Sequence, residues 1–358
     1  MEASHGLLDS TLAEITPADP EWRGKARARL EQLTMPHWAL GRLMDLAEDL
    51  AGMTRSLSPP VARKAVVVMA GDHGVTEEGV SLYPREVTVQ MVHNFVAGGA
   101  GINALARVSG SRVHVVDMGV SGDLSSLAKG GRILSRRIGA GTSNIARGPA
   151  MSREQAVACL EAGIGIARQL GDHVDVYGTG DMGIGNTTPS GAVAAAVTGE
   201  DAERVTGRGT GIDDAGLDRK IGVIRRVLEV NRPNSSDGID VLMKVGGFEI
   251  GGIAGLILGA AALKKPVVVD GYISTAGALI AKLLAPASAD YMIAAHRSAE
   301  GGHDLMQKHL QLEPLLDLGF RLGEGTGGAM AMPLLDGAVR LLGEVSTFEE
   351  AAVSGAKS

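Results

Sequence analysis

Short, almost continuously apolar runs recur along the chain and alternate with segments of helical pattern. Five such runs are 65–69 (AVVVM), 112–116 (RVHVV), 174–177 (VDVY), 266–269 (PVVV) and 291–294 (YMIA). A strand that is apolar at successive positions is covered on both faces, as in parallel sheets with helices on each side. The alternation therefore predicts an α/β fold with a doubly wound, mainly parallel sheet.

The segments between the runs have the apolar spacing of helices. We expect helices over 86–107, 152–170, 213–230 and 250–263. Ser152 and Gln155 stand at the two positions of a capping box. The last segment is apolar on all sides, which is typical of a buried helix.

Both ends of the chain are expected to be helical. Residues 1 to about 55 contain no strand signal. A stripe at helical spacing consists of Leu40, Leu43, Ala47 and Leu50. After Gly325 the pattern is again helical, over 326–342 and 347–354. We therefore expect a small helical domain, formed by 1–30 together with 311–358, beside a large α/β domain over 31–310.

Composition restricts the class of protein. Glycine supplies 51 of 358 residues, about twice its average usage, whereas only two Trp, four Tyr and four Phe are present. The core must then consist of small aliphatic side chains with closely packed backbones. A net charge of −7 without basic clusters argues against nucleic-acid binding. The single cysteine, Cys159, excludes a disulfide framework and is expected as a buried thiol on a helix.

The N-terminal sequence argues against export. MEASHGLLDSTLAEI carries acids where a signal peptide has a basic start and an apolar run. The longest apolar stretch, 250–263, has 14 residues, whereas a bilayer span needs about 20. We therefore expect a soluble cytoplasmic protein without a membrane partner.

Each apolar run leads into a loop of polar residues and glycine. The loops read AGDHG (70–74), DMG (117–119), GTGDMGIGNTT (178–188), DGY (270–272) and HRSAE (296–300). Ligands of open α/β sheets bind outside the carboxyl ends of the strands. Ordinary tight turns are also rich in Gly and Asp, but five such loops in succession favour a ligand site.

The third loop has the features of an anion site. It begins GTGDMG, which has GxGxxG spacing, but no acid follows at the end of a next strand, as a dinucleotide site requires. The glycine nest is followed by Asn186, Thr187 and Thr188 at a helix start, which is suited to one phosphate monoester. Ser298 is expected as a second anion contact, and GRGTG before Lys220 is another basic, glycine-rich element.

Metal and pyrophosphate sites are not indicated. The sequence VVVDGYISTAG is similar to a loop that binds phosphoribosyl pyrophosphate, but Gly271 stands where that loop has its second acid. His73 beside Asp72, and His296 with His303, match no metal-ligand spacing. We expect these histidines to be capping or hydrogen-bonded, and we expect neither a metal nor a cofactor.

Glu324 is flanked by glycines in RLGEGTGG, just before a helix. An acid at a helix start is commonly explained by the helix dipole. The flanking glycines also fit a carboxylate that points into a cavity without crowding, so a catalytic role and a structural role both remain open.

Taken together, these motifs resemble those of one family. They are AGDHGV (70–75), EVTVQMV (86–92), GDMGIGNTTPSGA (180–192), GGFEIGGIAG (246–255), VVVDGYISTAGAL (267–279), HRSAEGGH (296–303) and RLGEGTGGAMAMPLL (321–335). In this order, over about residues 35 to 350, the chain resembles nicotinate-nucleotide–dimethylbenzimidazole phosphoribosyltransferases. The resemblance implies that nicotinate mononucleotide and 5,6-dimethylbenzimidazole react to α-ribazole 5′-phosphate and nicotinate. It also implies a Rossmann-like sheet, a small helical domain and a homodimer.

The resemblance assigns roles to individual positions. Glu324 corresponds to the catalytic base. The substrate-binding residues implied are Ser81, Gln90 and Met182 for the azole, Gly183, Gly185, Asn186, Thr187, Thr188 and Ser298 for the phosphate, Lys220, Asp270 and Gly271 for the nucleotide, and Asp181. The chain departs from the family's usual residues at four positions. It has Asp181 where the family usually has Glu, Ala39 and Met44 where the family has Ser and Glu, and Gly328 where Ala is commoner.

Two further classes of function remain open from the sequence. One is another nucleotide-dependent phosphoribosyltransferase or a phosphorylase-like enzyme that uses a different azole or a purine. The other is a regulatory protein that binds a nucleotide or azole without catalysis. The carboxylate of Glu324 between glycines favours an enzyme, because binding alone needs no such base.

Overall fold

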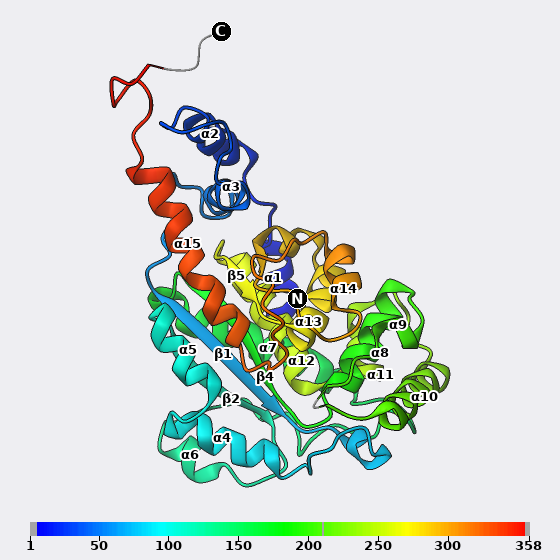
Figure 1. The fold of residues 1–358 in the computed structure, drawn as a ribbon. Coiled ribbons are helices and arrows are strands. Elements are labelled where there is room, and N and C mark those ends of the chain that lie inside the picture. Colours follow the sequence, from blue (N-terminus) through cyan, green and yellow to red (C-terminus); the bar gives the residue numbers. More distant parts are fainter. Residues whose placement is uncertain (1–5, 210, 355–358) are drawn as a thin grey trace, which may run out of the picture.

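A computed structural model describes residues 6–209 and 211–354 (Figure 1). Its centre is a six-stranded sheet in the order β3-β2-β1-β4-β5-β6, in which all pairs are parallel. The strands are β1 (Lys64–Gly71), β2 (Arg112–Gly119), β3 (Leu134–Ser135), β4 (Val176–Met182), β5 (Val267–Val269) and β6 (Met292–Ala294). The predicted α/β fold with a doubly wound parallel sheet is confirmed.

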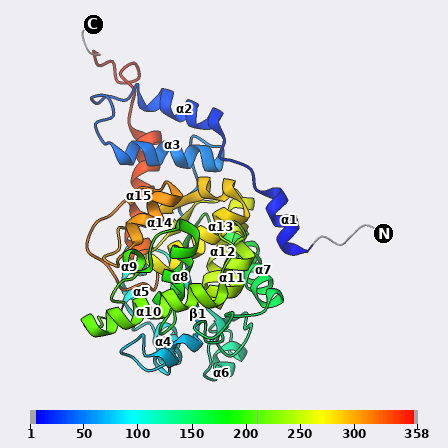
Figure 2. The same ribbon diagram turned by 90° about the vertical axis from the view of Figure 1, so that its right-hand side faces the viewer.

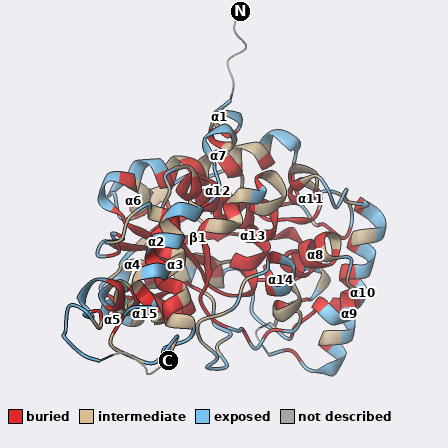
Figure 3. Cartoon of the chain, turned by 90° about the horizontal axis from the view of Figure 1, so that it is seen from above, coloured by how far each residue is buried: buried red, intermediate tan, exposed pale blue. Residues whose placement is uncertain are grey.

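Alternate side chains of β1 enter two separate hydrophobic clusters. Ala65, Val67 and Met69 pack on one face and Val66, Val68 and Ala70 on the other. The first face is covered by α7 (Arg153–Leu170), α8 (Thr187–Thr198), α10 (Asp214–Asn231), α11 (Gly238–Val245), α12 (Phe248–Ala262), α13 (Tyr272–Leu284) and α14 (His303–Leu310). The second is covered by α3 (Arg42–Thr54), α4 (Val87–Ala97), α5 (Gly101–Ser109) and α15 (Thr326–Glu344). Figure 3 shows the buried residues gathered around the sheet and α12.

The terminal helices lie in two places. The helix α2 (Pro20–Leu30) packs on α3, and α3 packs on α15, as Figure 2 shows. The helix α1 (Leu7–Glu14) lies apart from them, against α7 and α12. The remaining helices are short: α6 (Ser125–Lys129), α9 (Ala202–Val205) and 3-10 turns over Gly74–Glu78, Gly171–His173 and Pro286–Tyr291. The division into domains over 31–310 and over 1–30 with 311–358 stays a prediction.

Most expected helices are confirmed, and three expectations are wrong. The helices α7, α10 and α12 occupy the predicted segments, and Ser152 and Gln155 form the capping box. The segment 86–107 is two helices, because Gly98 has φ +81° and ends α4 as a left-handed cap. Leu40 precedes α3 and is exposed. Residues 347–354 form turns instead of a helix, and all but one of 348–354 are exposed, so they bury no apolar face.

The strand predictions differ from the structure at three points. The strands β1 and β2 continue to Gly71 and Gly119, so the expected second loop, 117–119, and the start of the first are strand. The strand β3 has only two residues, too short for an apolar pattern. The strand β4 begins at Val176 and continues to Met182, so the first part of the expected third loop is strand. Its glycines are needed for packing: a Cβ at Gly178 would lie 2.8 Å from Cε of Met332, and one at Gly180 would lie 2.6 Å from the backbone oxygen of Glu324.

Cys159 lies fully buried on α7, as expected. No helix among residues 6–209 and 211–354 combines the length and apolar character that crossing a bilayer requires.

The contact between α7 and α12 explains part of the glycine excess. A Cβ at Gly163 would lie 2.0 Å from the carbonyl oxygen of Gly252, and one at Gly255 would lie 2.0 Å from that of Leu160. The two helix backbones therefore touch without intervening side chains.

Two alanine substitutions on α7 test this contact. Gly163→Ala is expected to lower the free energy of unfolding by about 1–3 kcal/mol, because the added methyl group overlaps a backbone atom. Gly165→Ala is the matched control, since nothing lies within 4 Å of a Cβ there, and it should raise that free energy by about 0.5–1 kcal/mol. Urea denaturation measures both; equal effects would show that the helices do not depend on this close approach.

Candidate active site

A cavity of about 470 Å³ lies beyond the carboxyl ends of β4, β5 and β6, and the segment that follows β1 closes one side of it, so the cavity borders the gap between β1 and β4. The strand order reverses between these two strands, which is where ligands bind in doubly wound sheets. The volume is typical of small-molecule sites. The walls come from 80–83, α4, 181–187, Gly209, 271–273, 296–300 and 321–324.

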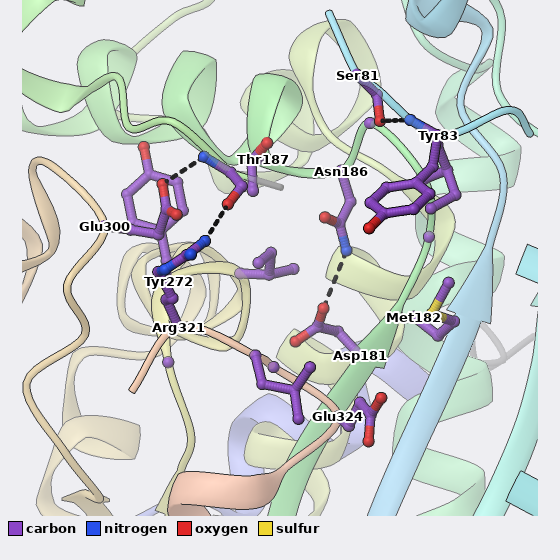
Figure 4. Close-up of a pocket in the computed structure, with 18 of the residues that line it drawn as sticks. Ser81, Tyr83, Asp181, Met182, Asn186, Thr187, Tyr272, Glu300, Arg321 and Glu324 are labelled. Carbon is purple, nitrogen blue, oxygen red and sulfur yellow. Dashed lines mark hydrogen bonds between the residues drawn. The ribbon is translucent and has the colours of Figure 1, made fainter. Parts of the chain in front are cut away.

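The cavity has chemically different sides. Figure 4 shows Thr187, Glu300 and Arg321 on one side, Tyr83 and Met182 on the opposite side, and the carboxylates of Asp181 and Glu324 between them. A ligand that fills the cavity would therefore meet polar groups at one end and apolar surface at the other.

Glu324 lies in a left-handed turn. Its φ is +63°, between Gly323 at +80° and Gly325 at +89°. A non-glycine residue in this region is strained, and such strain persists only where surrounding contacts enforce it. The contacts are close: a Cβ at Gly325 would lie 2.5 Å from Cγ1 of Val66. The turn therefore fixes the direction of the Glu324 side chain.

The carboxylate of Glu324 is buried and accepts one hydrogen bond from the part of the chain that the structure describes. Its Oε2 accepts the backbone N–H of Ile102, in the first turn of α5, at 3.1 Å. Burial raises the pKa of this carboxyl, the Ile102 N–H opposes the rise, and the charge of Asp270 adds to it. A carboxylate with a raised pKa in a cavity is suited to accepting a proton.

Asp270 holds the Glu324 turn in place from behind the cavity wall. Its Oδ2 accepts Gly325 N–H at 3.1 Å and its Oδ1 accepts Gly328 N–H at 2.9 Å. These donors belong to the N-terminus of α15, where a carboxylate satisfies otherwise unpaired N–H groups. Burial raises the pKa of Asp270, while His296 and the backbone donors lower it.

Asp181 lines the cavity next to Asn186. Its Oδ2 accepts the Asn186 side-chain N–H at 3.0 Å, while its Oδ1 is buried without a partner among the described residues. Burial and the nearby charge of Asp270 raise the pKa of Asp181 well above its usual range. The orphaned oxygen is available to a ligand.

The polar end of the cavity is built around the N-terminus of α8. Asn186 and Thr187 line the cavity, where the helix dipole favours an anion. Lys220 is fully buried, and its Nζ donates to Thr187 Oγ1 at 2.8 Å and to the Gly207 carbonyl at 2.9 Å. Burial lowers the pKa of Lys220 to about 8.

The opposite end of the cavity is largely apolar. Tyr83 and Met182 lie there, and the aliphatic or thioether side chains of Val80, Val87 and Met91 also line the cavity. Aliphatic and methionine side chains form adaptable surfaces for flat rings. Ser81, whose Oγ accepts Tyr83 N–H at 3.3 Å, adds a polar atom to this surface.

The structure brings ten of the fourteen sequence-predicted site residues together around the cavity. These are Ser81, Asp181, Met182, Gly183, Gly185, Asn186, Thr187, Gly271, Ser298 and Glu324.

The other four predicted residues do not line the cavity. Lys220 and Asp270 lie behind the wall. Lys220 donates to Thr187, which lines the cavity, and Asp270 accepts the N–H of Gly325, the residue after the lining residue Glu324. Thr188 is fully buried, and Gln90 is exposed on α4, where Val87 and Met91 face the cavity instead.

Of the three histidines discussed from the sequence, His73 and His303 are hydrogen-bonded as expected. His73 Nε2 lies 2.7 Å from Glu249 Oε1, and His303 binds Thr275 Oγ1 and Ser298 N–H, both at 2.9 Å. The expectation is wrong for His296, which lines the cavity. Its Nδ1 is buried without a partner in the part of the chain that the structure describes, and its Nε2 is 3.8 Å from Asp270 Oδ1.

Sequence reasoning missed several lining residues. They are Val80, Tyr83, Val87, Met91, Ile273, Arg321 and Leu322, whereas Tyr272 and Glu300 stand in the predicted loops 270–272 and 296–300 without an assigned role. The apolar ones carry no signal, because similar residues fill the core. Arg321 could have been predicted from the sequence, because it stands three residues before Glu324 in the motif RLGEGTGG.

Comparison with known proteins places the chain in a family. A family model described as phosphoribosyltransferase matches residues 15–353. A protein of Syntrophotalea carbinolica is 62% identical over 351 residues, covering 98% of this chain and 99% of its own. One of Desulfotalea psychrophila is 60% identical, covering 97% and 98%. Both are named nicotinate-nucleotide–dimethylbenzimidazole phosphoribosyltransferase.

A solved structure agrees. The crystal structure of the Thermus thermophilus protein with the same name superposes with a TM-score of 0.89 at 44% identity, covering 94% of this chain and 100% of that one. The chain belongs to the nicotinate-nucleotide–dimethylbenzimidazole phosphoribosyltransferase family.

Proposed function

We propose that this protein transfers the phosphoribosyl group of nicotinate mononucleotide to 5,6-dimethylbenzimidazole. The products are α-ribazole 5′-phosphate and nicotinate. The observation that carries the proposal is that one cavity combines an anion-binding helix N-terminus at Thr187, an apolar slot and the carboxylate of Glu324. The names of the relatives support the same reaction.

In the proposed mechanism the phosphate rests on the N-terminal residues of α8. The azole lies in the apolar slot between Met91 and Met182, with Ser81 beside it. Its unprotonated ring nitrogen attacks C1′ of the ribose. The C1′–nitrogen bond to the pyridinium breaks, and its electron pair returns to nicotinate. The pyridine leaves as a neutral ring nitrogen, so the leaving group needs no general acid.

Glu324 acts as the general base in this proposal. The attacking azole becomes cationic as the new bond forms, and its second N–H becomes acidic. The Glu324 carboxylate accepts that proton, so the product is a neutral benzimidazole. Attack opposite the leaving group converts the β configuration at C1′ to α. A positioned base typically contributes about 10²–10⁴-fold to the rate.

An acceptor comparison tests the proposal against the alternative enzymes. Nicotinate mononucleotide is mixed with dimethylbenzimidazole, adenine or inorganic phosphate in parallel, with and without EDTA, and products are separated by chromatography. We expect nicotinate release to be fastest with dimethylbenzimidazole, absent with phosphate alone and unaffected by EDTA. Faster release with adenine would support the alternative that uses a purine. Release that needs phosphate alone would support a phosphorylase instead.

The pH profile of kcat/KM should be bell-shaped. Glu324 must be ionised to accept a proton, and its pKa is raised above 4.5, so activity should fall in acid at a higher pH than for an ordinary glutamate. Lys220 supports the phosphate end as a cation, and it loses its proton above about pH 8. Activity should therefore also decline near that pH. An acid limb at or below 4.5 would contradict the assigned base.

The assembly and location are also proposals. We propose a cytoplasmic homodimer, as the family resemblance implies. Size-exclusion chromatography with light scattering should give twice the chain mass of 36.8 kDa, and the mass of one chain would contradict it.

A further inference from the structure

Arg321 differs from every other Arg or Lys among the described residues, because its side chain alone lines the cavity. It is exposed and precedes the Glu324 turn by three residues. Its Nη1 donates to the carbonyl oxygen of Gly209 at 3.2 Å. No carboxylate of the described chain forms an ion pair with it, whereas exposed arginines such as Arg208 and Arg225 have such partners.

Gly209 connects Arg321 to the polar end of the cavity. Its N–H donates to Glu300 Oε2 at 3.0 Å and its carbonyl oxygen accepts from Arg321, so these two side chains bind Gly209 through its two backbone polar groups. Figure 4 shows Glu300 and Arg321 on the same side of the cavity. A Cβ at Gly209 would lie 3.1 Å from Thr187 Oγ1 and 3.5 Å from Lys220 Nζ. The guanidinium is thus anchored beside the residues that form the anion end.

Lys220 and Arg321, the two cations at the polar end of the cavity, differ in their exposure to solvent and in how many of their N–H donors are in use. Lys220 is fully buried, and its ammonium binds Thr187 and Gly207 from behind the wall. Arg321 stands on the open side, and a guanidinium has five N–H donors, of which one is engaged with Gly209. Guanidinium groups bind phosphate oxygens through paired, charge-assisted hydrogen bonds.

We propose that Arg321 is the residue that selects a phosphorylated donor. On binding, the guanidinium exchanges its hydrogen bond to Gly209 for two bonds to the 5′-phosphate, on the side opposite α8. This inference rests on the proposed function, and it adds a determinant of donor specificity. The anion is the phosphate and not the nicotinate carboxylate, because Gly209 places Arg321 next to Thr187.

The test compares two donors that differ only in the phosphate, nicotinate mononucleotide and nicotinate riboside. Arg321→Met should lower kcat/KM for the mononucleotide by about 10- to 100-fold, mainly through KM, as expected for a lost charged hydrogen bond. For the riboside the change should be smaller than about threefold. Arg321→Lys keeps the charge but not the paired geometry, and it should recover part of the loss.

Arg219→Met is the matched control. Arg219 likewise donates to one glycine carbonyl, that of Gly79 at 3.4 Å, but it does not line the cavity. Arg219→Met should leave kcat/KM for both donors unchanged. The proposal would be overturned if Arg321→Met lowered kcat/KM equally for both donors, or for neither. An equal loss for both donors would assign Arg321 to the nicotinate carboxylate or to the Glu324 turn.

A binding measurement separates this inference from the proposed reaction. Calorimetric titration of nicotinate mononucleotide without an acceptor should show that affinity is highest for the wild type, lower for Arg321→Lys and lowest for Arg321→Met. Absence of α-ribazole 5′-phosphate with the wild type would refute the reaction only. Equal affinities of wild type and Arg321→Met would refute the role of Arg321 only.

Discussion

Replacing Glu324 by Gln should reduce kcat by about 10²–10⁴-fold while donor binding is retained. The amide cannot accept the azole proton, but its oxygen can still accept the Ile102 N–H that now binds the carboxylate at 3.1 Å. The turn should persist as well, because Gly325 and Asp270 hold it independently of the carboxylate charge. Steady-state rates of α-ribazole 5′-phosphate formation measure the loss.

Glu313→Gln is the control for the Glu324 variant. Glu313 is exposed on the same segment and does not line the cavity, so its rate should match the wild type. Calorimetry of nicotinate mononucleotide binding should give similar affinities for all three proteins. A rate near wild type for Glu324→Gln would show that another group, or water, takes the proton.

Replacing Asp270 by Ala should lower the free energy of unfolding by about 2–5 kcal/mol. Both carboxylate oxygens accept buried backbone N–H groups of Gly325 and Gly328, and each unpaired buried donor costs about 1–3 kcal/mol. The Glu324 turn is then no longer fixed, so the protein that remains folded should also lose turnover. Urea denaturation and rate measurements follow the two effects.

Asp304→Ala is the control for the Asp270 variant. Asp304 forms an exposed ion pair with Arg297 at 3.5 Å, and such pairs contribute about 0–1 kcal/mol. Its stability should therefore stay close to the wild type. If Asp270→Ala keeps full stability and loses only affinity for the nucleotide, Asp270 contacts substrate directly instead of holding α15.

Much of the fold could be predicted because it depends on local pattern. The strands β1, β2, β5 and β6 form at the continuous apolar runs, because helices cover both faces of these strands. Ser152 and Gln155 predicted the start of α7 because the capping box is a local interaction. By contrast, β4 extends into a glycine-rich sequence, where the decisive contacts are with Met332 and Glu324, far away in the chain.

The site was less predictable, because side-chain roles depend on contacts across the chain. The loops at the strand ends predicted where the cavity lies, and Glu324 indeed lines it. Asp270 belongs to one of these loops, yet both of its oxygens face the N-terminus of α15 and not the cavity. Gln90 and Met91 are neighbours in sequence, and only the rotation of α4 determines that Met91 faces the cavity.

The most direct test of the account is the product of the purified protein with its proposed substrates. The protein is incubated with nicotinate mononucleotide and 5,6-dimethylbenzimidazole, and products are followed by chromatography, mass spectrometry and NMR of the anomeric centre. We expect equimolar nicotinate and α-ribazole 5′-phosphate, with the α configuration, only when both substrates are present. Absence of this product at high enzyme concentration, or formation of the β anomer, would contradict this expectation.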